Sequence, residues 1–398
     1  MLHRLSKFKH IAKLPSSLQS NCLSTSSTGY GSSTTTSTES TLPLIDMRSD
    51  TVTKPTPDML SAMSTCQVGD DVFGEDPTIH ELESTAATLF GKDEALFVPS
   101  GTMGNLLGIL SHTQGTFGSE MIVGNKQHTF LYEQGNTASI GGVHSCVVPN
   151  QNNGTILLQD IADSVRHDDP HYAATKLVSL ENTHNMCGGV PLPVDYIDDV
   201  GELAKEKNIA LHIDGARICN ASAAQGVPLE RICRHVDSIS VCLSKGLGSP
   251  VGSLLVGETE FITRARRYRK ALGGGMRQAG ILAACGLISL NVMSHRLIVD
   301  HARLNMMTEG LLENCSPHVT AANRGGNEDG TDVMTTNLGF YTIVDGRAGE
   351  LVDALRDRHG ILMSAKDDNT IRACTHYHIG DDEIQRVVDG VKDVVKDW

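Results

Sequence analysis

The chain lacks a long apolar run. No uninterrupted apolar stretch approaches the ~20 residues that a membrane-spanning helix needs, so the sequence predicts a soluble protein with no membrane partner. The 10 cysteines include no C-x-x-C pair, which argues against a zinc site, any other cysteine-based metal site or a disulfide framework. Most of them have apolar neighbours, as buried thiols of a reducing compartment do: Cys146, Cys219, Cys233, Cys242 and Cys285.

Acidic residues are absent from the start of the chain, where the first is Glu39. Of the 26 residues from Ser16 to Thr41, 17 are Ser or Thr. Residues 1–41 therefore have the composition of a disordered organellar transit peptide, which predicts a mitochondrial protein. A disordered tail on a cytoplasmic protein is the alternative. The basic residues of this leader stand among apolar ones: Arg4, Lys7, Lys9 and Lys13.

The rest of the chain is strongly acidic. Without residues 1–41, which carry four basic and one acidic side chain, the formal net charge moves from −14 to −17. A surface of that sign repels nucleic acids and anionic membranes, so neither is expected as a partner.

From residue 42 onward, short apolar runs alternate with stretches of helical pattern, among them Val194–Lys207 and Leu229–His235. Several runs are nearly continuous in Val, Ile and Leu, which indicates strands covered by helices on both faces. The sequence predicts an α/β fold with an open, doubly wound, mostly parallel sheet of seven strands. The candidate strands are Glu94–Val98, Glu120–Gly124, Ser145–Val148, Lys176–Leu180, Ile209–Ile213, Asp237–Leu243 and Ser253–Val256.

The pattern changes after a long apolar helix expected over Gly280–Met293. We predict a large domain over 42–295 that includes an N-terminal arm, and a smaller C-terminal α+β domain over 296–398. The elements expected in the small domain are helices over His301–Glu313 and Glu350–Arg358, strands over Leu338–Val344 and Thr370–Thr375, and a last helix from Asp381.

Two short motifs stand at the ends of successive candidate strands: His-Ile-Asp-Gly-Ala-Arg at 212–217 and Leu-Ser-Lys-Gly-Leu-Gly at 243–248. Taken singly, Asp214 could be a helix cap and Lys245 a solvated loop charge. Apolar runs bracket Lys245, however, and a lone ammonium at the end of a buried strand is costly. Pyridoxal 5'-phosphate (PLP) needs an anion at its pyridine nitrogen and an amine on its aldehyde carbon. The pair therefore predicts a PLP enzyme.

A segment of small residues, Pro99-Ser100-Gly101-Thr102-Met103-Gly104-Asn105, follows the first candidate strand and opens a helix. Gly101 lets backbone N–H groups approach an anion at the helix start, and Thr102 adds a hydroxyl. The spacing fits neither a P-loop nor G-x-G-x-x-G, so a phosphate monoester suits it better than a nucleotide. A tight strand-to-helix turn without a ligand is the alternative.

Seven motifs in order carry a resemblance that runs from residue 46 to about 380. The series closely resembles the low-specificity L-threonine aldolases, PLP enzymes of the aspartate aminotransferase fold (fold type I). This resemblance implies retro-aldol cleavage of L-threonine or L-allo-threonine to glycine and acetaldehyde, a route of glycine formation. The motifs are Arg48-Ser49-Asp50-Thr51-Val52-Thr53-Lys54-Pro55, the segment 68–78, the Ser-Gly-Thr segment, Glu181-Asn182-Thr183-His184-Asn185, the motifs at 212–217 and 243–255, and Gly273-Gly274-Gly275-Met276-Arg277-Gln278.

The resemblance also implies roles at the cofactor. Lys245 should hold PLP covalently, and Asp214 should keep the pyridine nitrogen protonated. His128 should lie face to face with the ring, although a histidine that donates to a loop carbonyl has the same local sequence. His184 is the candidate base for the proton of the substrate's β-hydroxyl, and His128 is the competing candidate.

Arginines should bind the anionic groups. Arg217 and Arg372 match the family's carboxylate-binding arginines, with Ser49 adding a hydroxyl, although Arg372 could instead be a surface side chain. Arg277 resembles a residue that reaches the cofactor phosphate from a neighbouring subunit, which implies a homo-oligomer, expected to be a tetramer, with its active site at the subunit interface. The cations nearby are expected to form a solvated helix face: Arg264, Arg266, Arg267, Arg269 and Lys270.

The chain departs from the family pattern at Phe73, where some members have Tyr, and in a lengthened loop over Gly325–Thr331. Two rival functions stay open. One is another PLP reaction on this scaffold, such as β-elimination or a folate-dependent hydroxymethyl transfer. The other is a binding or assembly module without catalysis, for which a reactive amine would be superfluous.

Overall fold

The computed structural model describes residues 43–114, 116–322 and 336–398. The predicted leader over 1–41 and the predicted loop over Gly325–Thr331 lie outside the described residues. The described residues belong to one compact unit.

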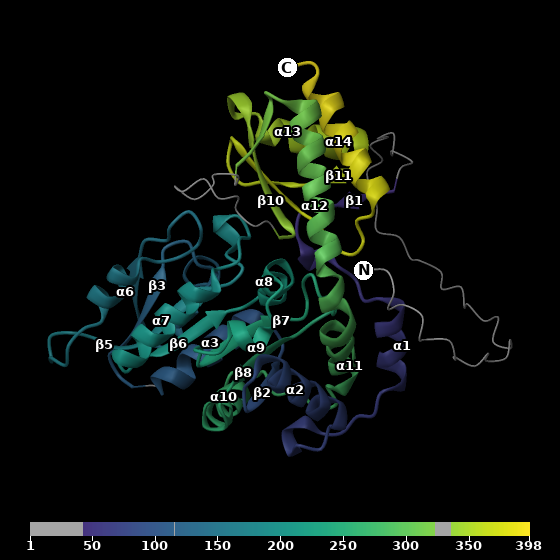
Figure 1. Cartoon of the computed structure of the whole chain (residues 1–398). Coiled ribbons are helices and arrows are strands. Elements are labelled where there is room, and N and C mark those ends of the chain that lie inside the picture. The colour runs from purple at the N-terminus through teal and green to yellow at the C-terminus, as the bar shows by residue number, and fades with distance from the viewer. Residues whose placement is uncertain (1–42, 115, 323–335) are drawn as a thin grey trace, which may run out of the picture. The chain divides into compact units, whose positions relative to one another are not determined.

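A seven-stranded sheet forms the centre of the larger part of the chain, which precedes the C-terminal part in sequence (Figure 1). All seven predicted strands are confirmed, each to within two residues at either end. The α/β, mostly parallel architecture is confirmed as well. In spatial order the strands are β2 (Glu94–Val98), β8 (Ser253–Gly257), β7 (Ser238–Cys242), β6 (Ala210–Asp214), β5 (Ala174–Glu181), β3 (Ser119–Gly124) and β4 (His144–Val148).

One strand of this sheet runs against the others. β8 pairs antiparallel with both β2 and β7, whereas the remaining neighbours pair in parallel. β2 therefore runs in the same direction as β7, so the carboxyl ends of six strands lie at one edge of the sheet. Ligands of open α/β sheets bind beyond that edge.

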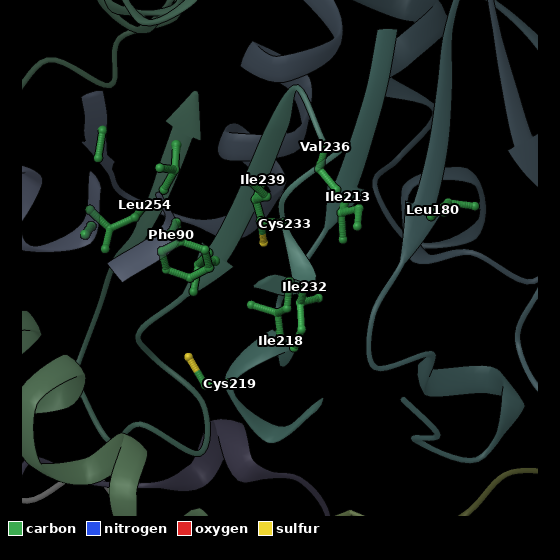
Figure 2. Close-up of a cluster of buried hydrophobic side chains, with 14 of the residues drawn as sticks. Phe90, Leu180, Ile213, Ile218, Cys219, Ile232, Cys233, Val236, Ile239 and Leu254 are labelled. Carbon is green, nitrogen blue, oxygen red and sulfur yellow. The ribbon is translucent and has the colours of Figure 1, made fainter. Parts of the chain in front are cut away.

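Apolar side chains leave the strands alternately toward two helical layers. Phe97 and Leu254 pack in the large core on one face, whereas their neighbours Leu96 and Leu255 pack on the other face with Leu107 of α3. Figure 2 shows the large core, in which Leu180, Ile213 and Ile239 of the central strands meet Phe90, Ile218 and Ile232 of the helices. Burial on both faces explains why these strands read as continuous apolar runs.

Local signals set the ends of the helices. In α2, for example, the Asp76 carboxylate caps the first turn, Pro77 opens the helix, and Gly91 ends it with φ of 63°. The other helices of this part are α1 (Pro57–Thr65), α3 (Gly101–Thr113), α4 (His128–Leu131), α5 (Asn136–Ser139), α6 (Leu158–Ser164), α7 (Val194–Glu206), α8 (Ile218–Gln225), α9 (Leu229–Ile232), α10 (Thr259–Ala271) and α11 (Gly280–Ile288).

Three predicted helices differ from the structure. α9 ends at Ile232, three residues before the predicted end at His235. The helices expected over Gly280–Met293 and His301–Glu313 are one continuous element, because α11 passes through a π-turn at Ser289–Met293 into α12 (Ser294–Cys315). No glycine or proline stands between residues 287 and 309 to interrupt the backbone hydrogen bonds.

The whole stretch Gly280–Cys315 is long and apolar enough to cross a membrane by length and composition alone. In its most apolar window, 44% of the residues are buried inside the protein. A core helix passes the same test, and this one packs against α2, α8 and α14.

The C-terminal part has its own sheet of antiparallel pairs, in the order β12-β13-β10-β9, and its own apolar core. The N-terminal arm reaches this core, since β1 (Ile45–Asp46) pairs in parallel with β11 (Ile361–Leu362). The domain boundary at 295/296 stays a prediction. The other elements are β9 (Val319–Ala321), β10 (Leu338–Ile343), α13 (Ala348–Ala354), β12 (Ser364–Ala365), β13 (Thr370–Cys374) and α14 (Asp381–Val395).

The prediction of a solvated cationic face on α10 is wrong for Arg269. Its side chain is 3% exposed, forms an ion pair with Asp71 at 2.7 Å and donates to the Phe97 carbonyl at 2.7 Å. Arg266 forms a partly buried pair with Glu83 at 2.9 Å. α10 packs against α3 and β2, so one side of this helix is buried. The number of basic residues in the sequence of α10 does not show which of them lie on the buried side.

Candidate active site

Polar residues gather where parallel strands end. Each of five strands that share one edge is followed by a segment named in the sequence analysis. Ser100–Thr102 follow β2, His128 follows β3, His184 follows β5, Asp214 closes β6 and Lys245 follows β7. The sheet thus brings together residues that are up to 145 positions apart in the chain.

Asp214 is 3% exposed at the end of β6. Its Oδ1 accepts the backbone N–H of Ala216 at 3.1 Å. No described residue donates to its other oxygen, so a buried carboxylate keeps one acceptor for a ligand.

His128 opens α4, and its ring is fixed by Glu133. Nδ1 lies 3.0 Å from Oε1 of that carboxylate, which also accepts the Asn105 amide at 2.8 Å. Burial opposes a charged imidazole, but the Glu133 hydrogen bond and the Asp214 charge outweigh it and raise the pKa of His128. The alternative of a bond to a loop carbonyl does not apply to this ring.

Glu181 closes β5 beside Asp214. One oxygen accepts the backbone N–H of His128 at 2.6 Å and the other that of Asn185 at 2.8 Å. Burial and the Asp214 charge raise the pKa of Glu181 to about 7. This carboxyl group therefore ties the segments after β3 and β5 together at the edge of the sheet.

His184 is fully buried, and neither ring nitrogen has a hydrogen-bond partner among the described residues. Burial lowers its pKa to about 4, while Asp214 acts in the opposite direction. The ring is therefore a neutral imidazole near pH 7. Buried polar atoms without partners are rare in native proteins, which points to a ligand.

Lys245 lies three residues beyond β7 and is partly buried. Its carbonyl accepts the Thr53 hydroxyl at 2.9 Å, which ties the N-terminal arm to this loop. Its amine has no hydrogen-bond or ion-pair partner within the described part of the chain, although its charge acts on Asp50 and His128.

Arg217 is 7% exposed and already paired. Its Nε and Nη2 donate to the two carboxylate oxygens of Asp50 at 2.8 and 2.6 Å, and Asn337 donates to Asp50 at 3.1 Å. Burial alone would raise the pKa of Asp50, but Arg217 holds it well below its usual range. A ligand can therefore use only the remaining N–H groups of Arg217.

Arg372 lies on β13 and reaches toward the same region. It donates to the Asn185 side chain at 3.0 Å and to the Arg48 carbonyl at 2.8 Å, and its Nε is buried without a partner. Burial and the nearby Arg217 lower its pKa. Ser49, next to Arg48, caps the short turn Asp50–Val52 and accepts the Thr51 N–H at 3.3 Å.

The Ser-Gly-Thr segment forms a capped helix start, because the Ser100 hydroxyl accepts the Met103 N–H at 3.2 Å. Gly101 has a packing role as well: a Cβ there would lie 2.7 Å from Sγ of Cys242. Thr102 is exposed beside it. The glycine thus lets α3 close onto β7 at the edge where the site lies.

Arg277 makes its side-chain contacts with residues outside this cluster. It pairs with Asp70 at 2.9 Å, lies over the Phe73 ring at 5.9 Å and is 55% exposed. Within the described part of one chain, the ion-pair partner of Arg277 is Asp70 and not a residue of the site.

Ligand-type atoms of His128, Glu133 and Asp214 lie within 4.8 Å of one another. Glu133 is already engaged by His128 and Asn105, so this geometry does not assign a metal. The donor set fits PLP instead: a buried carboxylate with a free oxygen for the pyridine nitrogen, an amine without a partner, and a helix start for the phosphate.

Comparison with known proteins agrees with this geometry. The family described as "Beta-eliminating lyase" matches residues 46–324. A probable low-specificity L-threonine aldolase 2 of Arabidopsis thaliana is 45% identical over 88% of this chain and 97% of its own length. The low specificity L-threonine aldolase of Escherichia coli K12 is 43% identical over 86% of this chain and 97% of its own. The chain belongs to the low-specificity L-threonine aldolase family.

Solved structures share the fold of this threonine aldolase family member. A Leishmania major threonine aldolase has a TM-score of 0.73 at 20% identity and covers 88% of this chain and 99% of its own. A Sphingomonas wittichii serine palmitoyltransferase has a TM-score of 0.67 at 16% identity, covering 89% and 88%. The expected fold type I architecture is confirmed.

Five residues of the aldolase site were not singled out from the sequence: Asp50, Asn105, Glu133, Glu181 and Asn337. A signal existed for three of them, since Asn105 stands at the end of the segment Pro99–Asn105. Glu181 closes a buried strand as Asp214 does, and Asp50 stands inside the first family motif. Asn337 comes from the distant C-terminal part, where only tertiary contacts reveal it.

Proposed function

We propose that the protein is a PLP-dependent aldolase that cleaves L-threonine and L-allo-threonine to glycine and acetaldehyde. The observation that carries the proposal is the shared edge of the sheet, where a free amine, a buried carboxylate and a neutral imidazole occur together. PLP, when bound, supplies an electron-withdrawing ring for the charge left on Cα. Lys245 would hold it covalently, Asp214 would face the pyridine nitrogen, and Gly101 and Thr102 would lie at the phosphate.

His184 is the base in this proposal. A neutral imidazole with two unpartnered nitrogens can accept the β-hydroxyl proton, directly or through a water. His128 is the poorer base, because Glu133 and Asp214 favour its protonated form. His128 would instead orient the ring of the cofactor.

Arg372 is the main cation for the substrate carboxylate, assisted by the free N–H groups of Arg217 and by Ser49. Arg372 keeps an unpartnered buried Nε, whereas Asp50 occupies two nitrogens of Arg217. A guanidinium group suits a carboxylate because its planar donors match the two oxygens.

The proposal includes a homo-oligomer, expected to be a tetramer, in which Arg277 reaches the cofactor phosphate of a neighbouring subunit. Its 55% exposure and its ion pair with Asp70, which is not a residue of the site, support this role. Sedimentation of wild type and Arg277→Ala, each with a PLP titration, tests it: the variant should bind PLP more weakly.

The leader supports a proposed mitochondrial location, with the cytoplasm as the alternative. A fusion of residues 1–41 to a fluorescent protein tests this directly. A diffuse cytoplasmic signal would remove the proposal.

The reaction itself is tested by incubating the PLP-loaded protein with L-threonine. Acetaldehyde and glycine in equal amounts are expected. Ammonia and a keto acid without acetaldehyde would instead favour β-elimination, the reaction in the family's description. Rates on L-threonine, L-allo-threonine and L-phenylserine would show the substrate preference, including any effect of Phe73.

A further inference from the structure

A chain of hydrogen-bonded side chains runs through the protein beneath the proposed active site. From His128 it passes to Glu133 at 3.0 Å, and from Glu133 to the Asn105 amide at 2.8 Å. Oδ1 of Asn105 lies 3.3 Å from Nε2 of His212. The Ser238 hydroxyl then joins Nδ1 of His212 at 2.8 Å to Nε2 of His112 at 2.7 Å.

The middle of this chain lies between the sheet and α3. His212 and Ser238 are opposite each other on β6 and β7, and both are fully buried. Asn105 and His112 belong to α3, which lies close enough that a Cβ at Gly108 would be 2.8 Å from the His212 ring. The glycine therefore permits the contact that joins helix and sheet.

The hydrogen bonds of this series of side chains allow one consistent assignment of donors and acceptors. Burial lowers the pKa of His212 to about 4 and that of His112 to about 3, so both rings are neutral near pH 7 and each has one N–H. Asn105 donates to Glu133, so its oxygen accepts from Nε2 of His212. Nδ1 of His212 must then accept from Ser238, whose oxygen accepts from His112.

Every donor therefore points toward Glu133, and bonds aligned in this way strengthen one another. The charged or titratable groups that act on His128 are Glu133, Asp214 and Lys245. Those that act on His112 are His212 and Arg264. His112 also lines a cavity of about 750 Å³. Asp237, another lining residue, precedes the first residue of β7, so this cavity lies at the edge of the sheet opposite to the proposed active site.

We propose that His112, Ser238 and His212 are positioning residues that, through Asn105, hold the Glu133 carboxylate on Nδ1 of His128. They thereby fix which nitrogen of that imidazole carries a proton and how the ring lies. None of the three touches the proposed ligands, and they act only through Glu133. The kinetic test of this inference rests on the proposed aldolase function, whereas the test by circular dichroism of the bound cofactor does not.

The sheet offers a matched control. Ser179 on β5 is opposite His212 on its other side, is equally buried, and its hydroxyl has no partner in the described structure. Ser238→Ala breaks the chain, whereas Ser179→Ala removes the same atoms beside the same ring without breaking it. His212→Leu is a second break, and His212→Gln can restore an N–H donor toward Asn105.

The experiment uses the full chain loaded with PLP. It records the visible circular dichroism of the bound cofactor, which reports ring orientation, and the pH dependence of kcat and KM with L-threonine. Ser238→Ala and His212→Leu should change the dichroism and lower kcat roughly tenfold with little change in KM, the effect of one lost buried hydrogen bond. The apparent pKa of His128 should fall. A Glu133 carboxylate that is less stabilised as an anion takes up a proton more readily, and a neutral Glu133 favours the charged imidazole of His128 less.

His212→Gln should recover most of both signals, and Ser179→Ala should match wild type. Identical dichroism and pH profiles for Ser238→Ala and Ser179→Ala would overturn the proposal. So would a loss of rate in Ser238→Ala with an unchanged pH profile and dichroism, since that pattern indicates a merely structural role. If wild type makes no acetaldehyde, the aldolase proposal fails, and the dichroism still tests the positioning role.

Discussion

Asp50 and Arg217 form a buried two-point ion pair, with Nε–Oδ2 at 2.8 Å and Nη2–Oδ1 at 2.6 Å. The pair joins the N-terminal arm to the loop after β6, and Asn337 from the C-terminal part completes it. Three distant segments thus converge on one carboxylate next to the proposed substrate site.

Asp50→Asn should destabilise the protein by about 3–5 kcal/mol, because it leaves a buried guanidinium without its counter-charge. Urea unfolding of wild type and variant measures this free energy. Glu350→Gln, which breaks an exposed pair with Arg347, is the control and should change the free energy of unfolding far less, because solvent screens that pair.

The same pair predicts a pH dependence of stability. The folded-state pKa of Asp50 is depressed, so its contribution is complete above the unfolded pKa of ~3.9 and is lost as pH falls toward the folded value. Wild type should therefore lose more stability than Asp50→Asn between about pH 5 and pH 2. Equal slopes for the two proteins would argue against the pairing.

Lys245→Ala should remove the visible absorbance band that PLP gives when it is held covalently, because no other amine replaces it. Lys207→Ala removes an exposed lysine whose partner is Glu206 and should leave the band intact. A persistent band in Lys245→Ala would assign the covalent bond to another lysine.

His184→Asn should lower kcat for L-threonine by about 10²–10⁴-fold, the usual contribution of a general base. Since burial lowers the pKa of His184 to about 4, the rate should depend on this group only below about pH 5 and not near 6.5. The exposed His295 on α12 supplies the control variant, His295→Asn, which should behave as wild type. A full rate in His184→Asn would transfer the role to His128.

Arg269→Met should destabilise the protein by about 3–5 kcal/mol, because Asp71 would remain buried and unpaired. Arg267→Met, on the exposed side of the same helix, should change stability by no more than about 0.5 kcal/mol. Thermal unfolding of the two variants compares them, and similar values would contradict the buried position of Arg269.

Much of the site could be predicted from particular residues. Asp214 and Lys245 each follow an apolar run, and because parallel strands end at the same edge, their proximity follows from the strand pattern. The helix start at Gly101 and the histidines at 128 and 184 also follow predicted strands, so they are expected at the same edge. Local signals such as Asp76-Pro77 and Gly91 likewise mark the ends of α2.

Other features needed long-range contacts. Arg269 and its neighbours are alike in sequence, and only the packing of α10 separates a buried cation from solvated ones. The hydrogen bonds that link His112 to His128 involve the strands β6 and β7 and the helices α3 and α4. No local sequence pattern indicates these bonds.

By itself the sequence determined the type of fold, the cofactor chemistry to expect and the residues at the strand ends, because periodicity and residue type act locally. Only the tertiary structure decided which charges are paired: Asp50 with Arg217, Asp71 with Arg269, Glu133 with His128. Which charges pair depends on which distant side chains the fold brings within about 3 Å of each other. The free energy of a buried charge depends in turn on whether it has such a partner.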